Sequence, residues 1–84
     1  MYYVYILKSI RDKHFYVGYT GNLKKRFEEH EQGKVISTMS RRPLKLVYYE
    51  ACLNKYDATY REKYLKTAWG KRYIKNRIKF YLTG

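Results

Sequence analysis

Two short segments near the start of the chain alternate between two kinds of side chain, and this alternation constrains the fold more than any other feature. The segments YYVYIL and HFYVGY are rich in Tyr, Val, Ile and Phe, and KSIRDK between them contains an Asp-Lys turn. Such residues at a period of two favour strands, so the sequence predicts an antiparallel hairpin. Tyr5 then lies on one face of the first strand and Val4 on the other. If Tyr16 shares the face of Tyr5, Val17 points to an opposite, apolar face that suits a core.

The next segment has the period of a helix. Leu23, Arg26, Phe27 and His30 fall at i, i+3, i+4 and i+7, and Asn22 is a suitable N-cap before them. The helix is expected to end at the following glycine. Arg26 and His30 therefore flank the buried stripe. The residues expected to face water are Lys25, Glu28 and Glu29.

The remaining segments complete an α+β fold. We predict in turn a polar loop, a third strand, a second helix and a last basic helix, for KVISTMSRRP, LKLVYYEAC, DATYREKYLK and KRYIKNRIKFYL. The second helix would be capped by Asn54 or Asp57 and would stop near Gly70. The order ββαβαα indicates a small three-stranded antiparallel sheet with flanking helices, in one domain over residues 1–84.

The charge of the chain points to a polyanionic partner. The sequence has 19 Lys and Arg against 7 Asp and Glu, which gives a formal net charge of +12 on 84 residues. Self-repulsion of this size opposes compaction in a small domain, so a solubility role alone does not account for it. A basic protein whose lysines only solvate its helices, a ribosome-bound protein and a membrane-surface protein stay open as alternatives.

Cysteine use and the start of the chain bear on the compartment. Cys52 is the only cysteine, so neither a disulfide framework nor a cysteine-based metal site is expected. The apolar start reaches Lys8 too early for a signal peptide or a spanning helix. We therefore expect a cytoplasmic protein with no membrane association.

Most enzyme classes are excluded by their missing motifs. The sequence has no Ser-His-Asp set, no glycine-rich phosphate loop, no HExxH and no metal-spaced Cys/His cluster. Its seven carboxylates do not show the converging pattern that a two-metal nuclease needs. A single Glu can still hold Mg²⁺, because that ion keeps several waters and often takes one or two protein carboxylates.

The chain resembles the GIY-YIG nuclease domain in the order and spacing of several short motifs. VYI lies in the first predicted strand, YVG in the second, Arg26 and His30 on the next helix, and a Glu in a later helix. The resemblance covers nearly the whole chain. The chain is similar to the small stand-alone bacterial members of this superfamily, and to the domain found in bacterial excinuclease and phage homing endonucleases. The name-giving triplets read YVY and YVG here, and both changes leave the tyrosines in place. Gly18 is expected to mark a bulge or a close backbone approach.

The resemblance implies a role for each of five residues. Tyr5 and Tyr16 would lie near the attacking water, with Tyr5 as the general base, a role that needs a nearby cation because a free phenol has a pKa of about 10. Arg26 would contact the phosphate oxygens and stabilise developing charge. His30 would orient Tyr5 or relay its proton. Glu62 would hold a single Mg²⁺ or Mn²⁺, which polarises the phosphate.

Each of these residues also has an ordinary structural interpretation. Tyr5 and Tyr16 are two of 12 tyrosines in a chain with strand-forming segments. Arg26 suits a solvated helix position. Glu62 would pair with Lys66 at i,i+4, a contact worth about 0.2–0.5 kcal/mol.

The function expected from the resemblance is a metal-dependent DNA endonuclease, directed by DNA structure or by a partner. The alternative is a catalytically idle basic module that binds nucleic acid, RNA included. Tyr19 stands directly after the motif glycine, where many relatives carry a basic residue, so a phosphate contact is missing there. The residues expected to contact phosphates without reading sequence are Lys24, Lys25, Arg41, Arg42, Lys71 and Arg72.

Overall fold

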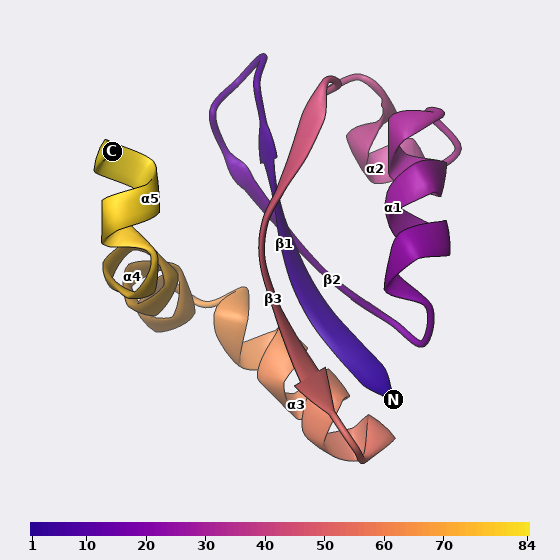
Figure 1. Cartoon of the computed structure of the whole chain (residues 1–84), viewed down its shortest axis with the longest axis vertical. Helices are drawn as coiled ribbons and strands as arrows, with labels where there is room; N and C mark the ends of the chain where they lie inside the picture. Colours follow the sequence, from indigo (N-terminus) through magenta and orange to yellow (C-terminus); the bar gives the residue numbers. More distant parts are fainter.

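The computed structural model describes residues 1–84 as a three-stranded antiparallel sheet between two layers of helices (Figure 1). The predicted α+β class and the strand-helix order are confirmed, with two short helices added. The elements are β1 (Tyr2–Ser9), β2 (Phe15–Thr20), α1 (Leu23–Glu31), α2 (Ile36–Met39), β3 (Leu44–Cys52), α3 (Lys55–Leu65), α4 (Ala68–Arg77) and α5 (Lys79–Thr83).

The register of the sheet places the motif tyrosines on one face. The strand order is β2-β1-β3, so β1 is the central strand and β2 is an edge. Tyr5 lies opposite Gly18 of β2 and opposite Tyr49 of β3. Directly opposed residues share a face of an antiparallel sheet, and residues two apart on a strand do so too. Tyr16 therefore shares the face of Tyr5, as the alternation predicts.

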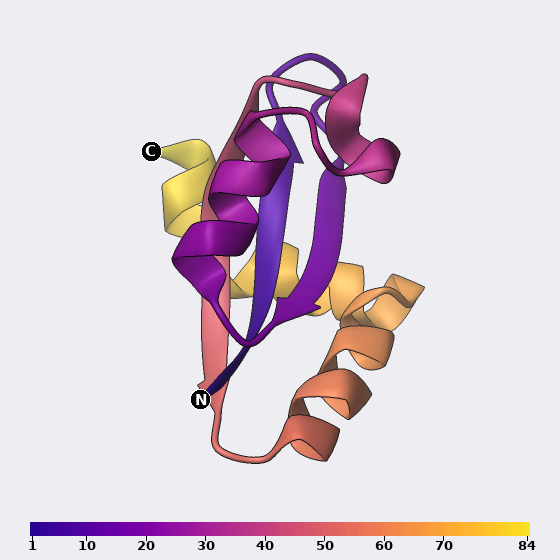
Figure 2. The ribbon, with the colours of Figure 1, turned by 90° about the vertical axis from the view of Figure 1, so that its right-hand side faces the viewer.

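The apolar face of the hairpin packs against α3 and α4. Val4, Ile6 and Val17 form a buried cluster there, joined by Leu65 of α3 and Ile74 of α4. Figure 2 shows α3 and α1 on different sides of the sheet. The larger part of the core thus lies behind the tyrosine face.

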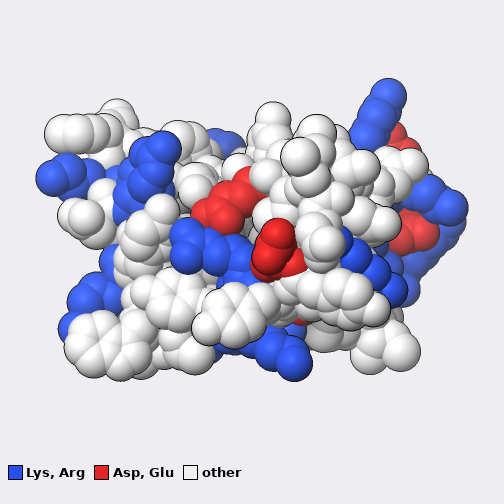
Figure 3. All heavy atoms as spheres, turned by 90° about the horizontal axis from the view of Figure 1, so that it is seen from below, with Lys and Arg blue, Asp and Glu red and all other residues white.

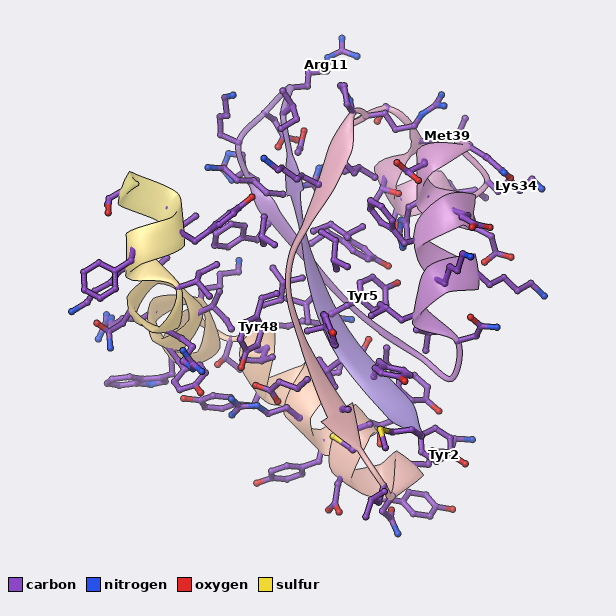
Figure 4. The ribbon with its side chains drawn as sticks, viewed as in Figure 1. Tyr2, Tyr5, Arg11, Lys34, Met39 and Tyr48 are labelled. Atoms are coloured by element: carbon purple, nitrogen blue, oxygen red, sulfur yellow. The ribbon has the colours of Figure 1, made fainter.

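The tyrosine face holds a second, smaller core. Tyr5 and Leu7 cluster with Leu44 of β3, and Phe27 of α1 packs against them. Tyr5 is only 1% exposed, and in Figure 4 it lies between β1 and α1, whereas Tyr48 points towards the opposite layer. The periodic stripe of α1 is therefore directed at this face, and the first catalytic candidate is a core residue.

The predicted polar loop before β3 contains the short helix α2. The amides of Thr38 and Met39 both donate to the carbonyl of Val35, at 3.1 and 2.9 Å. Val35 and Thr38 are buried, which anchors the segment beside α1. The prediction of a loop is wrong for Ile36–Met39, because a helix of four residues is too short to show a period in sequence.

Two further boundaries differ from the prediction. Asn54, one of the two predicted caps, accepts a hydrogen bond from the amide of Tyr56 and starts α3. Gly70 does not stop that helix but lies inside α4, where a Cβ would stand 2.8 Å from the carbonyl carbon of Leu65. The missing side chain lets α4 turn closely against the end of α3. The last basic helix is divided at Ile78, whose φ of −115° and ψ of 29° leave the helical region.

None of the helices has both the length and the apolar composition that crossing a bilayer requires.

Candidate active site

The first element of the site is the ring of Tyr5, which lies across Gly18 of the neighbouring strand. A Cβ at position 18 would stand 2.8 Å from Cε1 of Tyr5 and closer still to Cζ and Oη. Real Cβ atoms do not approach other atoms this closely. Glycine is therefore needed here for a close approach, as predicted, and no register shift occurs in the pairing of β1 with β2.

Three rings meet on the tyrosine face, and we call Tyr5, Tyr16 and His30 the ring cluster. The ring centroids are 6.4 Å apart for Tyr5 and Tyr16, 5.6 Å for Tyr5 and His30, and 5.1 Å for Tyr16 and His30. His30 comes from the last turn of α1 and is fully buried. Strand register and helix period together bring these three predicted residues into contact.

A chain of hydrogen bonds connects Tyr5 to α2. The hydroxyl of Tyr5 lies 2.8 Å from Nε2 of His30, and Nδ1 of His30 lies 2.7 Å from Oγ1 of Thr38. The Thr38 hydroxyl is 3.5 Å from the carbonyl oxygen of Val35, its acceptor. Every proton in this chain finds an acceptor when Tyr5 donates to Nε2 and Nδ1–H donates to Thr38. His30 is then a neutral imidazole that accepts a hydrogen bond from the phenol.

The protonation of the ring cluster follows from burial. Burial raises the pKa of Tyr5 to about 12; the Arg26 guanidinium acts against this, while Tyr16 and Glu62 add to it. Burial, with a smaller effect from the Arg26 charge, lowers the pKa of His30 to about 4. In the free protein the shared proton therefore belongs to Tyr5, and a phenolate forms only if further positive charge arrives.

Arg26 projects from α1 beside an open hollow at the end of β2. The hollow has a volume of about 490 Å³ and is lined by Tyr19, Thr20, Gly21, Asn22, Lys25, Arg26 and Glu29. The side chain of Arg26 is 37% exposed, and its pKa is raised chiefly by its interaction with the Tyr5 hydroxyl. Its guanidinium is therefore open to solvent while it stays close to the buried phenol.

One expectation for α1 needs correction. The helical period directs Glu29 towards water, but its Oε1 is bonded to Nη1 of Arg26 at 3.1 Å, and its side chain is 31% exposed. The two residues are one turn apart on α1, which brings their side chains together. The Arg26 guanidinium is thus bonded to the Glu29 carboxylate, which an incoming phosphate would have to displace.

Glu62 comes from α3, in the other helix layer. Its side chain is 21% exposed and its carboxylate pairs with Lys66 at 3.3 Å, the i,i+4 contact that the sequence predicts. Its charge still contributes to the raised pKa of Tyr5. Glu62 is therefore within electrostatic range of the ring cluster, although no hydrogen bond joins it to those residues.

The donor groups around the site fit some metal ions and not others. No group of three or more His, Cys, Asp or Glu side chains is arranged to hold an ion. This excludes a closed protein site of the kind that binds Zn²⁺. A lone Glu62 carboxylate fits Mg²⁺ or Mn²⁺, since such ions are bound through one or two carboxylates together with waters and substrate phosphates.

The predicted phosphate contacts do not lie together on one surface. Lys25 lines the hollow beside Arg26, and Lys24 lines a neighbouring one on the other flank of α1. Lys71 and Arg72 belong to α4, in the opposite layer. A nucleic acid that touched all of these residues would have to pass around the edge of the sheet.

Arg41 and Arg42, two of the predicted phosphate contacts, also have partners within the protein. Arg41 donates to Asp12 at 2.8 Å and to the carbonyl of His14 at 3.1 Å. Arg42 donates to the carbonyls of Met39, at 3.0 Å, and Glu31, at 3.3 Å. Both guanidinium groups connect backbone segments, because an arginine fork satisfies several carbonyls at once. Their contact with a phosphate stays a prediction.

The hydrogen-bonding residue that the sequence did not reveal is Thr38. It lies in the segment expected to be a polar loop, and nothing in its spacing connects it to His30. Only the burial of α2 beside α1 brings them within 2.7 Å. Asn76 lines a hollow with Trp69 and Tyr73 on α4, away from the ring cluster.

The fold and the ring cluster define a GIY-YIG domain: paired tyrosines on neighbouring strands, followed by a helix that carries an Arg and a His. Residues 1–79 match the family described as the GIY-YIG catalytic domain, and the chain belongs to this family. The family is one of nucleases, so the coarse class of the protein is that of a nuclease domain.

Several bacterial relatives share this domain. UPF0213 protein CPE1444 of Clostridium perfringens is 48% identical over 67 residues, which are 79% of this chain and 71% of the relative. A UPF0213 protein of Limosilactobacillus reuteri is 44% identical over 77% of this chain and 70% of its own length. One from Pediococcus acidilactici is 38% identical over 89% of this chain and 82% of its own length. These names state no activity. No solved structure matches the chain.

Proposed function

We propose that the chain is a metal-dependent DNA endonuclease that hydrolyses phosphodiester bonds and is directed by DNA structure or by a partner. The observation that carries this proposal is the contact of Tyr5 and Tyr16 with His30, beside the partly exposed Arg26. A buried phenol with an acceptor for its proton, next to a fixed cation, is suited to proton transfer. Simple binding of nucleic acid requires none of this arrangement.

The ring cluster would provide the base. Tyr5 acts as a base only after it gives up its own proton, and Nε2 of His30, at 2.8 Å, is the acceptor in contact. A pKa of about 12 for Tyr5 and about 4 for His30 opposes this transfer in the free protein. Positive charge near the phenol is therefore a condition of activity, and Arg26 supplies part of it. The phenolate would then take a proton from the attacking water.

Arg26 would bind the phosphate. Its planar fork is bonded to Glu29 at 3.1 Å, and it can exchange this carboxylate for two phosphate oxygens without losing hydrogen bonds. The developing negative charge of the transition state would then lie against a permanent cation. Lys25, which lines the same hollow, would add to the attraction for the strand.

Glu62 would hold the divalent ion. A single Mg²⁺ or Mn²⁺ there would polarise the phosphate and stabilise the leaving oxygen. The Glu62 carboxylate is already within electrostatic range of Tyr5, and its present partner Lys66 is an exposed, flexible side chain. Exchange of one cation for another at this carboxylate therefore involves little rearrangement of the fold.

The alternative is a catalytically idle module that binds nucleic acid, and one observation favours it. Three of the candidate groups have an internal polar partner: Tyr5 has His30, Arg26 has Glu29, and Glu62 has Lys66. Tyr5 is also only 1% exposed. In this alternative the site residues are structural, and the net charge alone carries out the function.

The two functions are separated by one cleavage assay. Duplex, nicked, flapped and branched DNAs, together with single-stranded RNA, would be incubated with the protein in Mg²⁺ or Mn²⁺ and compared with EDTA. We expect cleavage of at least one DNA with either ion and none in EDTA. Tyr16→Phe should abolish it, while Tyr49→Phe, a change to a 54% exposed tyrosine, should not. Binding without cleavage of any substrate would establish the idle module instead.

A further inference from the structure

Helix α4 carries two different surfaces on its exposed sides. Trp69, Arg72, Tyr73 and Asn76 follow the spacing i, i+3, i+4 and i+7 and so lie on one side of the helix. Gly70 and Ile74 form its buried side. Lys71 and Lys75, one turn apart, lie on the remaining flank, and Lys79 of α5 continues that row.

The first surface is an open hollow of about 480 Å³, which we call the aromatic hollow. It is lined by Tyr64, Trp69, Arg72, Tyr73 and Asn76. Trp69 is 69% exposed, and the guanidinium of Arg72 lies 4.9 Å from the centre of its ring. Trp69 and Arg72 thus present a large aromatic ring that faces water beside a cation, which is a stacking surface.

The floor of the aromatic hollow is held in place by Arg61. Its guanidinium lies 4.6 Å from the ring centre of Tyr73 and 5.3 Å from that of Tyr64. Two hydrogen bonds of 2.9 Å tie the same guanidinium to Glu50 of β3, which also accepts a bond from Tyr48. The two tyrosine rings are therefore fixed before any ligand arrives, which lowers the entropy that binding has to overcome.

The second surface is a pocket of about 340 Å³ between α4, α5 and the β1–β2 turn, which we call the lysine pocket. No carboxylate lines it. Five lysines surrounding one pocket repel one another, and this repulsion is relieved by an anion with several charges. Its lining residues are Lys8, Lys13, His14, Phe15, Lys71, Lys75, Lys79, Leu82 and Thr83.

We propose that α4 binds a single-stranded nucleic acid, with bases stacked in the aromatic hollow and backbone phosphates in the lysine pocket. The two surfaces lie on different flanks of one helix whose diameter is about 10–12 Å, so a strand laid across it reaches both. Stacking on Trp69 needs an unpaired base, because base pairing hides the faces of the bases within the helical stack. The +12 charge and the absence of carboxylates from both surfaces favour a polyanion over a protein partner.

This site is separate from the proposed active site. Arg61 and Glu50 connect the aromatic hollow to β3, whereas the ring cluster and Arg26 lie on the other face of the sheet. Figure 3, which views the molecule from the side of α3, shows ring-bearing white side chains next to blue ones at its lower left, while red groups lie at its centre and right. Binding at α4 uses none of the proposed catalytic groups, so it holds whether or not the chain cleaves DNA.

The protein contains its own probe for this proposal, because Trp69 is the only tryptophan. Its fluorescence would be followed in EDTA during titration with oligo-dT and oligo-U of about 12 nucleotides, a length within the usual site size, and with a blunt duplex. We expect saturable quenching by one or both single strands and much weaker quenching by the duplex at equal nucleotide concentration. Quenching that is equal for single strand and duplex would overturn the proposal.

Variants test the same point by labelled-strand anisotropy. Trp69→Ala should weaken binding of the single strand by about tenfold, the loss typical of one stacked base, and binding of the duplex by less than about twofold. Lys75→Ala should reduce the salt slope by about one for the single strand. Tyr60→Ala, which removes a 79% exposed ring outside both surfaces, is the matched control. Unchanged affinity in Trp69→Ala, with its helix content intact by circular dichroism, would refute base stacking at α4.

Discussion

The ring of Tyr5 occupies the space that any side chain at position 18 would fill. The two residues are directly opposed in the pairing of β1 with β2, and a Cβ on Gly18 would overlap the phenol. The glycine of the YVG triplet thus fixes the position of the tyrosine of the YVY triplet. Two motifs that look independent in sequence form one packing unit, and that unit sets where the Tyr5 hydroxyl meets His30.

Gly18→Ala should displace Tyr5 and disable the site. Inserting a methyl group into filled space costs about 1–3 kcal/mol, and the ring has to rotate away from His30 or β2 has to shift. We expect a lower urea midpoint and loss of cleavage together. Gly21→Ala is the control, because nothing lies within 4 Å of a Cβ there. A Gly18→Ala variant that keeps full stability would show that the ring is not held where the structure places it.

The burial of His30 predicts how stability depends on pH. Its pKa in the fold is about 4, against 6.5 for the free side chain, so the unfolded chain binds the proton more readily. Stability is therefore complete above about pH 6.5 and falls as pH drops towards 4, by roughly 1–3 kcal/mol. Urea unfolding across this range measures the slope. His30→Gln should flatten it.

The second histidine is the control for that slope. His14 is exposed, and the chain contains only these two histidines. His14→Gln should leave the slope between pH 4.5 and 6.5 as it is. Asp12 and Glu50 also have lowered pKa values, and the slope that they cause begins only near the ordinary carboxylate pKa of about 4, at the lower end of this window. A slope that persists in His30→Gln and disappears in His14→Gln would reverse the assignment.

The elements were predictable wherever one local pattern decides them. The alternation around Tyr5 and Tyr16 predicts the hairpin, and the period from Leu23 to His30 predicts α1, because a single buried face is enough to specify each. The break at Ile78 and the helix α2 were not predictable. The first has helix-forming neighbours on both sides, and the second is held by the burial of Thr38 rather than by any repeat.

The candidate site was predictable in its members but not in its connections. Family resemblance identified Tyr5, His30 and Arg26, and the structure adds that the Tyr5 hydroxyl is hydrogen-bonded to His30 and that Arg26 is held by Glu29. Such contacts depend on rotamers and on the angle between α1 and the sheet, which no spacing encodes. The same limit applies to the bonds of Arg41 to the hairpin, because its charge predicts a phosphate contact and gives no sign of an internal partner.

Arg41 offers a test that separates charge from geometry. The Arg41 guanidinium donates to Asp12 and to the carbonyl of His14. The backbone carbonyl of Arg41 accepts a hydrogen bond of 2.6 Å from the Ser9 hydroxyl. Arg41→Lys keeps the charge but removes the fork, so we expect a decrease on the order of 1–2 kcal/mol in stability. Binding of nucleic acid at a temperature where the variant is folded should hardly change. Lys34→Ala, an exposed change of charge, serves as the reference for surface effects. If Arg41→Lys melts like the wild type, the fork has no structural role.

Glu62→Gln tests the proposed metal ligand with the least disturbance of the fold. The change preserves size and helix propensity, and the one structural interaction that it removes is the ion pair with Lys66, worth about 0.2–0.5 kcal/mol. Without the carboxylate charge the divalent ion is held weakly, so cleavage should collapse, while DNA affinity in EDTA stays equal or rises because one negative charge near phosphate is gone. Lys66→Ala breaks the same ion pair but leaves the carboxylate, and should keep cleavage. Melting curves, affinity in EDTA and cleavage with Mg²⁺ or Mn²⁺ are the three measurements. Cleavage that survives in Glu62→Gln would remove this residue from the mechanism.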